Sequence, residues 1–213
     1  MSFRTDHYAA LAKTLIAKME KRHFEAHYCA TKKEALVLAL SLIPDGASVT
    51  HGGCMTIEEI GLVDAVKQGV YNYIDRSVAT TPDEKREAIA KGMMAHTFLM
   101  SANAISRDGE LVNIDGFGNR VAGTIYGPER VFLVVGRNKI APDLTGAIDR
   151  ARNIAAPLNA RRLNRHTPCA VGEPRCHDCR SPEKVCGVMT VFFMPPTSIK
   201  EFHAILVDED LGY

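Results

Sequence analysis

The segment RVFLVVG, residues 130–136, decides the fold class of this 213-residue chain. It is almost continuously apolar, without the alternation of a half-exposed strand, and it ends in glycine. Such a run is typical of a central strand of a parallel sheet, covered on both faces. Further short apolar runs are expected to form neighbouring strands, at residues 47–50, 97–105, 189–194 and 202–207.

The spans between these runs carry helix signals. Residues 32–43 are apolar nearly all round, so we expect a well-buried helix there, and residues 143–163 predict a long helix interrupted near Pro157. Strands that alternate with helices predict a single layered α/β domain over residues 1–213, with a largely parallel sheet. Three Thr-x-x-Glu patterns are typical of the capping boxes that start helices: Thr31 with Glu34, Thr56 with Glu59, and Thr81 with Glu84.

Composition narrows the possible functions. With 46% hydrophobic residues, the chain can bury one sizeable core. A formal net charge of +1 and the absence of Trp give no basis for a nucleic-acid surface. The amphipathic N-terminal residues do not resemble a secretory signal, and no apolar stretch has the length of a membrane span. We therefore expect a cytoplasmic protein with no nucleic-acid or membrane partner, and a homo-oligomer stays possible.

Four of the six cysteines gather in one short stretch, TPCAVGEPRCHDCRSPEKVC. They are spaced C-x6-C-x2-C-x6-C, at Cys169, Cys176, Cys179 and Cys186. The inner C-x-x-C pair can direct two thiolates at one ion, and two more complete the four-sulfur tetrahedron that Zn²⁺ or an iron–sulfur cluster prefers. Because disulfides are uncommon without a secretory signal, we predict a cysteine metal loop at residues 167–188. Two disulfides, or free thiols in a mobile loop, are the alternatives.

The first loop that could carry chemistry follows the first expected strand, in the sequence THGGCMT. Gly52 and Gly53 let the backbone come close to a ligand, and the N–H groups of a helix starting at Thr56 favour an anion. His51 could bind that anion or act as an acid or base. Cys54, whose thiolate the helix dipole favours, is a candidate nucleophile. The alternative is an ordinary strand-to-helix turn with a buried cysteine.

A second loop is dense in Asn, Asp and Gly, and its two Asp-Gly turn signals predict a hairpin-like excursion. Asp115 is the candidate general base, with Asn103 and Asn113 as ligand hydrogen-bond donors and Asn119 beside them. Asx-turns that cap their own backbone are the alternative. Lys139, which follows the 130–136 strand in GRNKI, could reach over the strand ends to a phosphate or carboxylate. The two loops would form one cleft if they converge at one edge of the sheet.

Several motifs together resemble the lactate-utilisation (LUD) domain family over essentially the full chain. They are HGGCMTIEEIG, ANAISRDGELVNIDGFGNR, the cysteine loop, which resembles a four-cysteine subset, and ILVDEDLGY. The resemblance implies a fold similar to ribose-phosphate isomerases and CoA transferases, and it places Asn103, Asn113 and Asp115 near the ligand cleft. Fold alone does not fix a reaction. Relatives often carry Ser where this chain has Cys54, which bears on any role that needs a hydroxyl there.

The resemblance also implies a part in the oxidation of lactate to pyruvate, alongside separate iron–sulfur and oxidoreductase partner proteins. In this first hypothesis the chain is a redox-linked subunit or accessory, its cysteines hold an iron–sulfur cluster, and its cleft binds a small anionic metabolite. The chain lacks a GxGxxG fingerprint that would support its own nicotinamide or flavin site. In the second hypothesis it is a stand-alone enzyme on a sugar-phosphate or CoA-linked metabolite, with structural zinc at the cysteines. A regulatory ligand-binding domain is the third.

Overall fold

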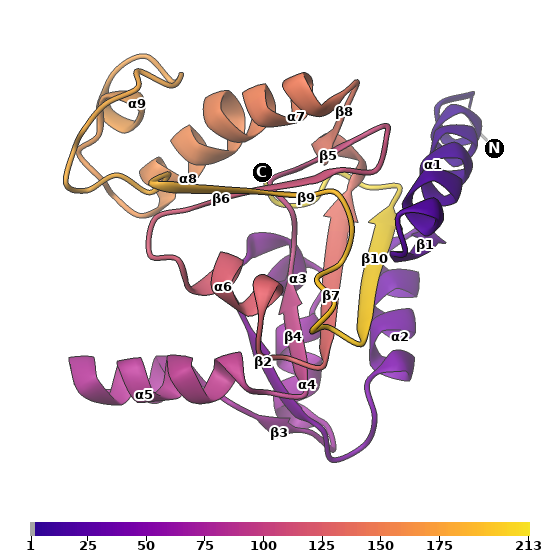
Figure 1. Ribbon diagram of the computed structural model, residues 1–213, viewed down its shortest axis with the longest axis horizontal. Coiled ribbons are helices and arrows are strands. Elements are labelled where there is room, and N and C mark those ends of the chain that lie inside the picture. The colour runs from indigo at the N-terminus through magenta and orange to yellow at the C-terminus, as the bar shows by residue number, and fades with distance from the viewer. Residues whose placement is uncertain (1–2) are drawn as a thin grey trace.

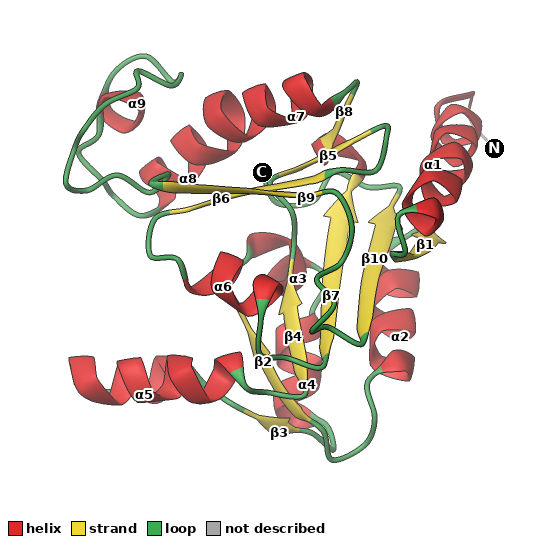
Figure 2. Ribbon diagram, in the orientation of Figure 1, coloured by secondary structure: helices red, strands yellow, loops and turns green. Residues whose placement is uncertain are grey.

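The computed structural model describes residues 3–213 and contains two sheets joined by helices (Figures 1 and 2). The first sheet has six strands in the order β1-β10-β7-β4-β2-β3, and every neighbouring pair is parallel. This confirms the prediction of a layered α/β fold with a largely parallel sheet. The strands are β1 (Glu25–Cys29), β10 (Glu201–Val207), β7 (Arg130–Gly136), β4 (Thr97–Met100), β2 (Ser48–His51) and β3 (Asn72–Tyr73).

Strand β7 lies inside this sheet, between β10 and β4, and has the bounds expected for RVFLVVG. Val131, Leu133 and Val135 enter one hydrophobic cluster, whereas Phe132 and Val134 enter another. All five are 0% exposed. The continuous apolar run thus reflects two covered faces, since successive strand residues point to opposite sides.

Helices α2 (Lys32–Leu42), α3 (Met55–Glu59) and α4 (Leu62–Gln68) cover one face of the first sheet. The prediction that residues 32–43 form a well-buried helix is only half right. Ala35 and Ala39 are buried, but Val37 is 67% exposed, because α2 covers the sheet with a single stripe.

The opposite face is covered by α1 (Phe3–Lys21) and by the second sheet. Helix α1 buries one side chain per turn from Tyr8 to Met19. No helix within residues 3–213 has both the length and the apolar character needed to cross a membrane.

The second sheet has the order β8-β5-β6-β9 and lies between the first sheet and the α7–α8 helix (Figure 1). Strands β5 and β6 form the expected hairpin, and Gly109 allows its tight turn with a φ of +91°. The expected long helix runs past Pro157 through a π-helical turn, Ala151–Ala155. The elements here are β8 (Ile140–Ala141), β5 (Ala104–Ser106), β6 (Leu111–Asp115), β9 (Val188–Phe192), α7 (Leu144–Arg150) and α8 (Ala156–Arg162).

The predicted capping boxes have different outcomes. Thr81 and Glu84 form a complete capping box at α5, and the Thr31 side chain accepts from the backbone of Glu34 at α2. The prediction for Thr56 is wrong, because Cys54 is the N-cap of α3 and Thr56 lies inside the helix. The remaining elements are α5 (Pro82–Met93), α6 (Asn119–Ile125), α9 (Pro168–Val171) and the 3₁₀ turns Arg76–Val78 and Arg137–Lys139.

Candidate functional site

A small cavity lies where the parallel strands β2, β4 and β7 end. Open α/β sheets bind their ligands outside the carboxyl ends of their strands. The volume of this cavity, about 20 Å³, is room for a single water molecule. We call it the Lys139 cavity, and its lining residues are Gly53, Cys54, Met55, Thr56, Ser101, Ala102, Asn103, Arg120, Lys139, Gly212 and Tyr213.

The Lys139 side chain places an ammonium group in this cavity. The 3₁₀ turn after β7 buries the side chain to 3% exposure. Its Nζ donates to Thr56 Oγ1 at 2.7 Å and to Ser101 Oγ at 2.9 Å, and within residues 3–213 no carboxylate forms an ion pair with it. Burial lowers its pKa to about 8, opposed by the nearby Cys54 thiol. An ammonium group has three donors, so one donor remains for a ligand.

Two arginines add positive charge around Lys139. The Arg120 side chain lies over Gly52, where an added Cβ would be 2.5 Å from Arg120 Cγ, so only glycine fits there. Arg150, 8% exposed, donates from Nη1 to the backbone oxygen of Asn103 and from Nε to a second carbonyl at 2.8 Å. Its charge also lowers the pKa of Lys139. The cavity is therefore electrostatically suited to an anion.

The segment that follows β10 closes the cavity. Gly212 has a φ of +56°, and a Cβ at this position would lie 2.6 Å from Thr56 Oγ1. The Gly212 N–H donates to Glu59 Oε2 at 2.7 Å. The Tyr213 hydroxyl donates to Asn159 Oδ1 at 2.7 Å. A ligand larger than water can reach Lys139 only if this segment moves.

His51 and Asn119 lie in a second cavity, of about 10 Å³, together with Arg76. His51 Nδ1 is 2.6 Å from the Tyr73 hydroxyl, and the two rings are stacked. Burial, assisted by the charge of Arg76, lowers the pKa of His51 to about 4. The imidazole is therefore neutral near pH 7, and its Nδ1 can accept a hydrogen bond from the Tyr73 hydroxyl.

The side chains of Asn103 and Asn113 each accept a hydrogen bond from the backbone at or beside the other residue. Asn103 Oδ1 accepts from the Ile114 backbone N–H at 2.7 Å, and Asn113 Oδ1 accepts from the Asn103 N–H at 3.0 Å. The Nδ2 group of Asn113 is buried without a hydrogen-bond partner among residues 3–213. These contacts hold β5 and β6 in register next to the Lys139 cavity.

Asp115 has a set of structural partners. Its carboxylate accepts from the backbone N–H groups of Phe117, Arg120 and Val121 at 3.2, 3.0 and 3.4 Å, and Arg120 Nε lies 3.5 Å away. The carboxylate thus organises the turn that leads into α6. Its assignment as general base stays a prediction.

The cysteine loop extends from the end of α8 to β9. Arg152 Nη2 donates to Cys176 Sγ at 3.4 Å. Burial raises the pKa of the Cys186 thiol, and Cys169, Cys176 and Cys179 lie near enough to raise it further. All six cysteines are unpaired thiols, and within residues 3–213 no three of these sulfurs lie within 4.8 Å of one another. The four loop thiols share one neighbourhood, and as a donor set they suit a soft ion or an iron–sulfur cluster.

Residues 12–207 match the family model of the LUD domain. The chain belongs to the LUD domain family. This family is associated with lactate utilisation. No curated protein matches the sequence.

A solved structure with the same fold is the crystal structure of a DUF162 family protein from Deinococcus radiodurans. It is similar to this LUD domain with a TM-score of 0.53 and 12% sequence identity, over 93% of this chain and 97% of that chain. At this identity the likeness shows the fold alone.

In this LUD domain the structure separates the residues that the sequence proposed for one cleft. Gly53, Cys54, Thr56, Asn103 and Lys139 line one cavity, whereas His51 and Asn119 line the other. Gly52 lies under Arg120, and Asn113 and Asp115 line neither cavity. The sequence prediction missed Ser101, Arg120, Tyr213 and Arg76. Ser101 had a usable signal, because it directly follows a buried strand.

Proposed function

We propose that this LUD domain binds a small organic carboxylate, of the size of lactate or pyruvate, in the Lys139 cavity. The observation that supports this most is a buried ammonium group whose partners are two neutral hydroxyls, at Thr56 and Ser101. Burying a charge without a counter-ion is costly, and an anionic ligand beside Lys139 would offset that cost. On this proposal the chain serves lactate oxidation as a redox-linked subunit or accessory.

The chemistry of the lining explains why a small carboxylate fits best. A carboxylate has two acceptor oxygens, and Lys139 and Arg120 supply charged donors in the same cavity. The Thr56 and Ser101 hydroxyls can rotate to serve the hydroxyl or carbonyl oxygen of a 2-hydroxy or 2-oxo acid. Binding requires Gly212 and Tyr213 to move away from the cavity. Their return over the bound ligand would exclude bulk water.

The cysteine loop is the second component of the proposal. Cys169, Cys176, Cys179 and Cys186 would hold an iron–sulfur cluster or Zn²⁺, and binding would draw the sulfurs together. A cluster supplies one-electron transfer, and zinc supplies a structural crosslink. With a cluster bound, electrons would pass to iron–sulfur and oxidoreductase partner proteins. The Arg152 side chain, which donates to Cys176 Sγ, would stabilise the charge of the thiolates.

The test is calorimetric titration of the purified chain with L-lactate, pyruvate and acetate. We expect lactate or pyruvate to bind, and Lys139→Met to abolish that binding, because the buried ammonium is removed. Lys91→Met, at an exposed position of α5, is the matched control and should bind as the parent does. Equal binding by the parent and Lys139→Met would overturn the proposal.

A phosphorylated metabolite is the second candidate, because Arg76 and Arg120 lie close enough for the charge of one to act on the other. A sugar phosphate held by these cations would make the chain a stand-alone enzyme with structural zinc. Ribose 5-phosphate and a CoA thioester belong in the same titration series. A preference for either over lactate and pyruvate would favour this candidate.

A further inference from the structure

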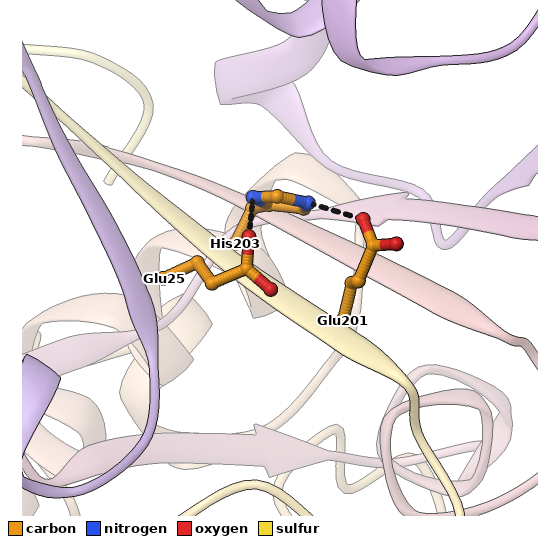
Figure 3. Close-up of side chains that lie close together, drawn as sticks. All are labelled: Glu25, Glu201 and His203. Carbon is orange, nitrogen blue, oxygen red and sulfur yellow. Dashed lines mark hydrogen bonds and ion pairs between the residues drawn. The ribbon is translucent and has the colours of Figure 1, made fainter.

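A second polar cluster lies at the opposite edge of the first sheet, where its strands begin. Glu25 starts β1, Glu201 starts β10, and His203 follows Glu201 by two residues. The parallel register places Glu25 beside His203. Because residues two apart on a strand share a face, Glu201 and His203 point to the same side of β10. The three side chains therefore meet on one face, as Figure 3 shows.

His203 is the centre of this cluster. Its side chain is 2% exposed, with Nδ1 3.2 Å from Glu25 Oε2 and Nε2 3.2 Å from Glu201 Oε2 (Figure 3). The Phe132 ring stacks on the imidazole at 4.6 Å between centroids and fixes its orientation. A neutral imidazole has only one N–H and can donate to only one of the two carboxylates. A metal ion at one ring nitrogen would supply the positive charge that the two carboxylates lack.

The charges around His203 favour a cation. Glu25 and Glu201 face it, and Glu20 of α1 acts electrostatically on the adjacent His27. Arg130 offsets part of this charge, since its Nη2 lies 2.6 Å from Glu201 Oε1. The same guanidinium donates from Nη1 to Leu42 O, the last residue of α2, at 2.8 Å. The carboxylates thus outnumber the one arginine, and the carbonyl end of α2 adds negative potential.

We propose that His203, Glu25 and Glu201 bind a divalent transition-metal ion of the Zn²⁺ class. One ligand atom from each residue lies within 4.8 Å of those from the other two. Zn–N and Zn–O bonds of about 2.0–2.2 Å place neighbouring ligands of a tetrahedral ion roughly 3.3–3.6 Å apart. An ion on Nε2 has this spacing to Glu201 Oε2, which lies 3.2 Å from Nε2. Glu25 Oε2, which lies 3.2 Å from the other ring nitrogen, Nδ1, has to turn toward such an ion.

The two glutamates are free to move, whereas His203 is fixed, and this difference suits the binding of a metal ion. The Glu25 and Glu201 side chains are 48% and 31% exposed, so an ion can enter from solvent while His203 stays fixed. An ion takes one ring nitrogen, and the other keeps a hydrogen bond. The His27 ring nitrogen 3.2 Å from Nδ1 is available for that bond. An imidazole with two carboxylates selects zinc or manganese over the softer ions that thiolates prefer.

Cobalt titration separates this site from the cysteine loop, because thiolate-bound Co²⁺ absorbs strongly in the near ultraviolet and nitrogen- or oxygen-bound Co²⁺ does not. We expect chelator-stripped full-length protein to bind one Co²⁺ without that absorption, apart from any ion at the cysteines. Glu25→Gln keeps the size of the side chain and removes its charge. It should weaken the sulfur-independent binding by about tenfold or more while melting like the parent without metal.

His203→Gln should abolish this binding, and His7→Gln, at an exposed position of α1, is the matched control. Because His203 is buried, His203→Gln could fail to fold. In that case the metal affinity of Glu25→Gln tests the proposal. Unchanged Zn²⁺ stoichiometry and affinity in Glu25→Gln and Glu201→Gln would overturn the proposal. So would the absence of any sulfur-independent ion in the parent. Neither result depends on lactate binding, so the proposed function is tested separately.

Discussion

Lys139 Nζ lies 2.7 Å from Thr56 Oγ1, although 83 positions separate the two residues in the chain. This contact joins the end of β7 to α3 through a buried positive charge. The contact explains why Thr56 does not cap its helix, because its hydroxyl is occupied by Lys139 and the backbone of Leu211. The same contact leads to the first prediction.

Lys139→Met should stabilise the fold while it removes carboxylate binding. The pKa of Lys139 is lowered from 10.5 to about 8, so the unfolded chain holds the proton more tightly than the folded chain. Parent stability is therefore lowest below pH 8 and rises between pH 8 and 10.5. The variant should gain about 1–3 kcal/mol at pH 7, and less at pH 10. Urea unfolding at both values measures this, and a loss of stability at pH 7 would contradict it.

His51 should make the protein sensitive to mild acid. Its pKa is lowered from 6.5 to about 4, so its stabilising contribution is present above pH 6.5 and is lost as the pH falls toward 4. The loss should be on the order of 2–3 kcal/mol. His51→Gln removes this dependence, so the difference in unfolding free energy between parent and variant should shrink from pH 7.5 to pH 4.5. A constant difference would show that His51 titrates normally.

Asp115→Asn should lower stability by about 1–2 kcal/mol. The carboxylate accepts from three backbone N–H groups, and an amide offers only one oxygen to them. Thermal melting measures the effect, with Asp83→Asn, exposed near the start of α5, as the control. A parent-like melting temperature combined with lost ligand binding would instead support the general-base assignment.

Cys176→Ser should lower the metal content of the cysteine loop and the melting temperature together, because a four-thiolate ion contributes to folding. Metal and acid-labile sulfide analysis of protein purified without oxygen identifies the ion. Iron with sulfide would favour the redox-linked role, and one equivalent of zinc would favour a structural one. Cys29→Ser, in β1 and outside the loop, is the control for metal content. A variant that keeps both its metal and its melting temperature would exclude this site.

The sequence predicted best where one local signal determined the outcome. Strand β7 was predicted with correct bounds because a short, almost continuously apolar run that ends in glycine is typical of a doubly covered strand. Strand β1 escaped prediction because EAHYC mixes polar and apolar residues, and its pairing partner β10 follows more than 170 positions later. Such a pairing has no local signature.

The candidate site was predicted only in part for the same reason. Lys139 was expected because it follows the strongest strand, and it does reach over the strand ends. Tyr213 was missed because it comes to the cavity from the distant C-terminal end of the chain, and Arg120 was missed although it directly follows Asn119 in the second candidate loop. His51 and Lys139 line separate cavities, and no spacing in the sequence predicts that separation.

Substitution of Gly212 offers a way to open the Lys139 cavity in crystals of this family member. A methyl group there would meet the Thr56 hydroxyl at 2.6 Å, and the backbone conformation itself resists any L side chain. Alanine at this position would act as a wedge that holds the closing segment away from Lys139, while every charge and every hydrogen-bonding side chain stays in place. Crystals of Gly212→Ala should therefore admit soaked ligands that the closed cavity excludes.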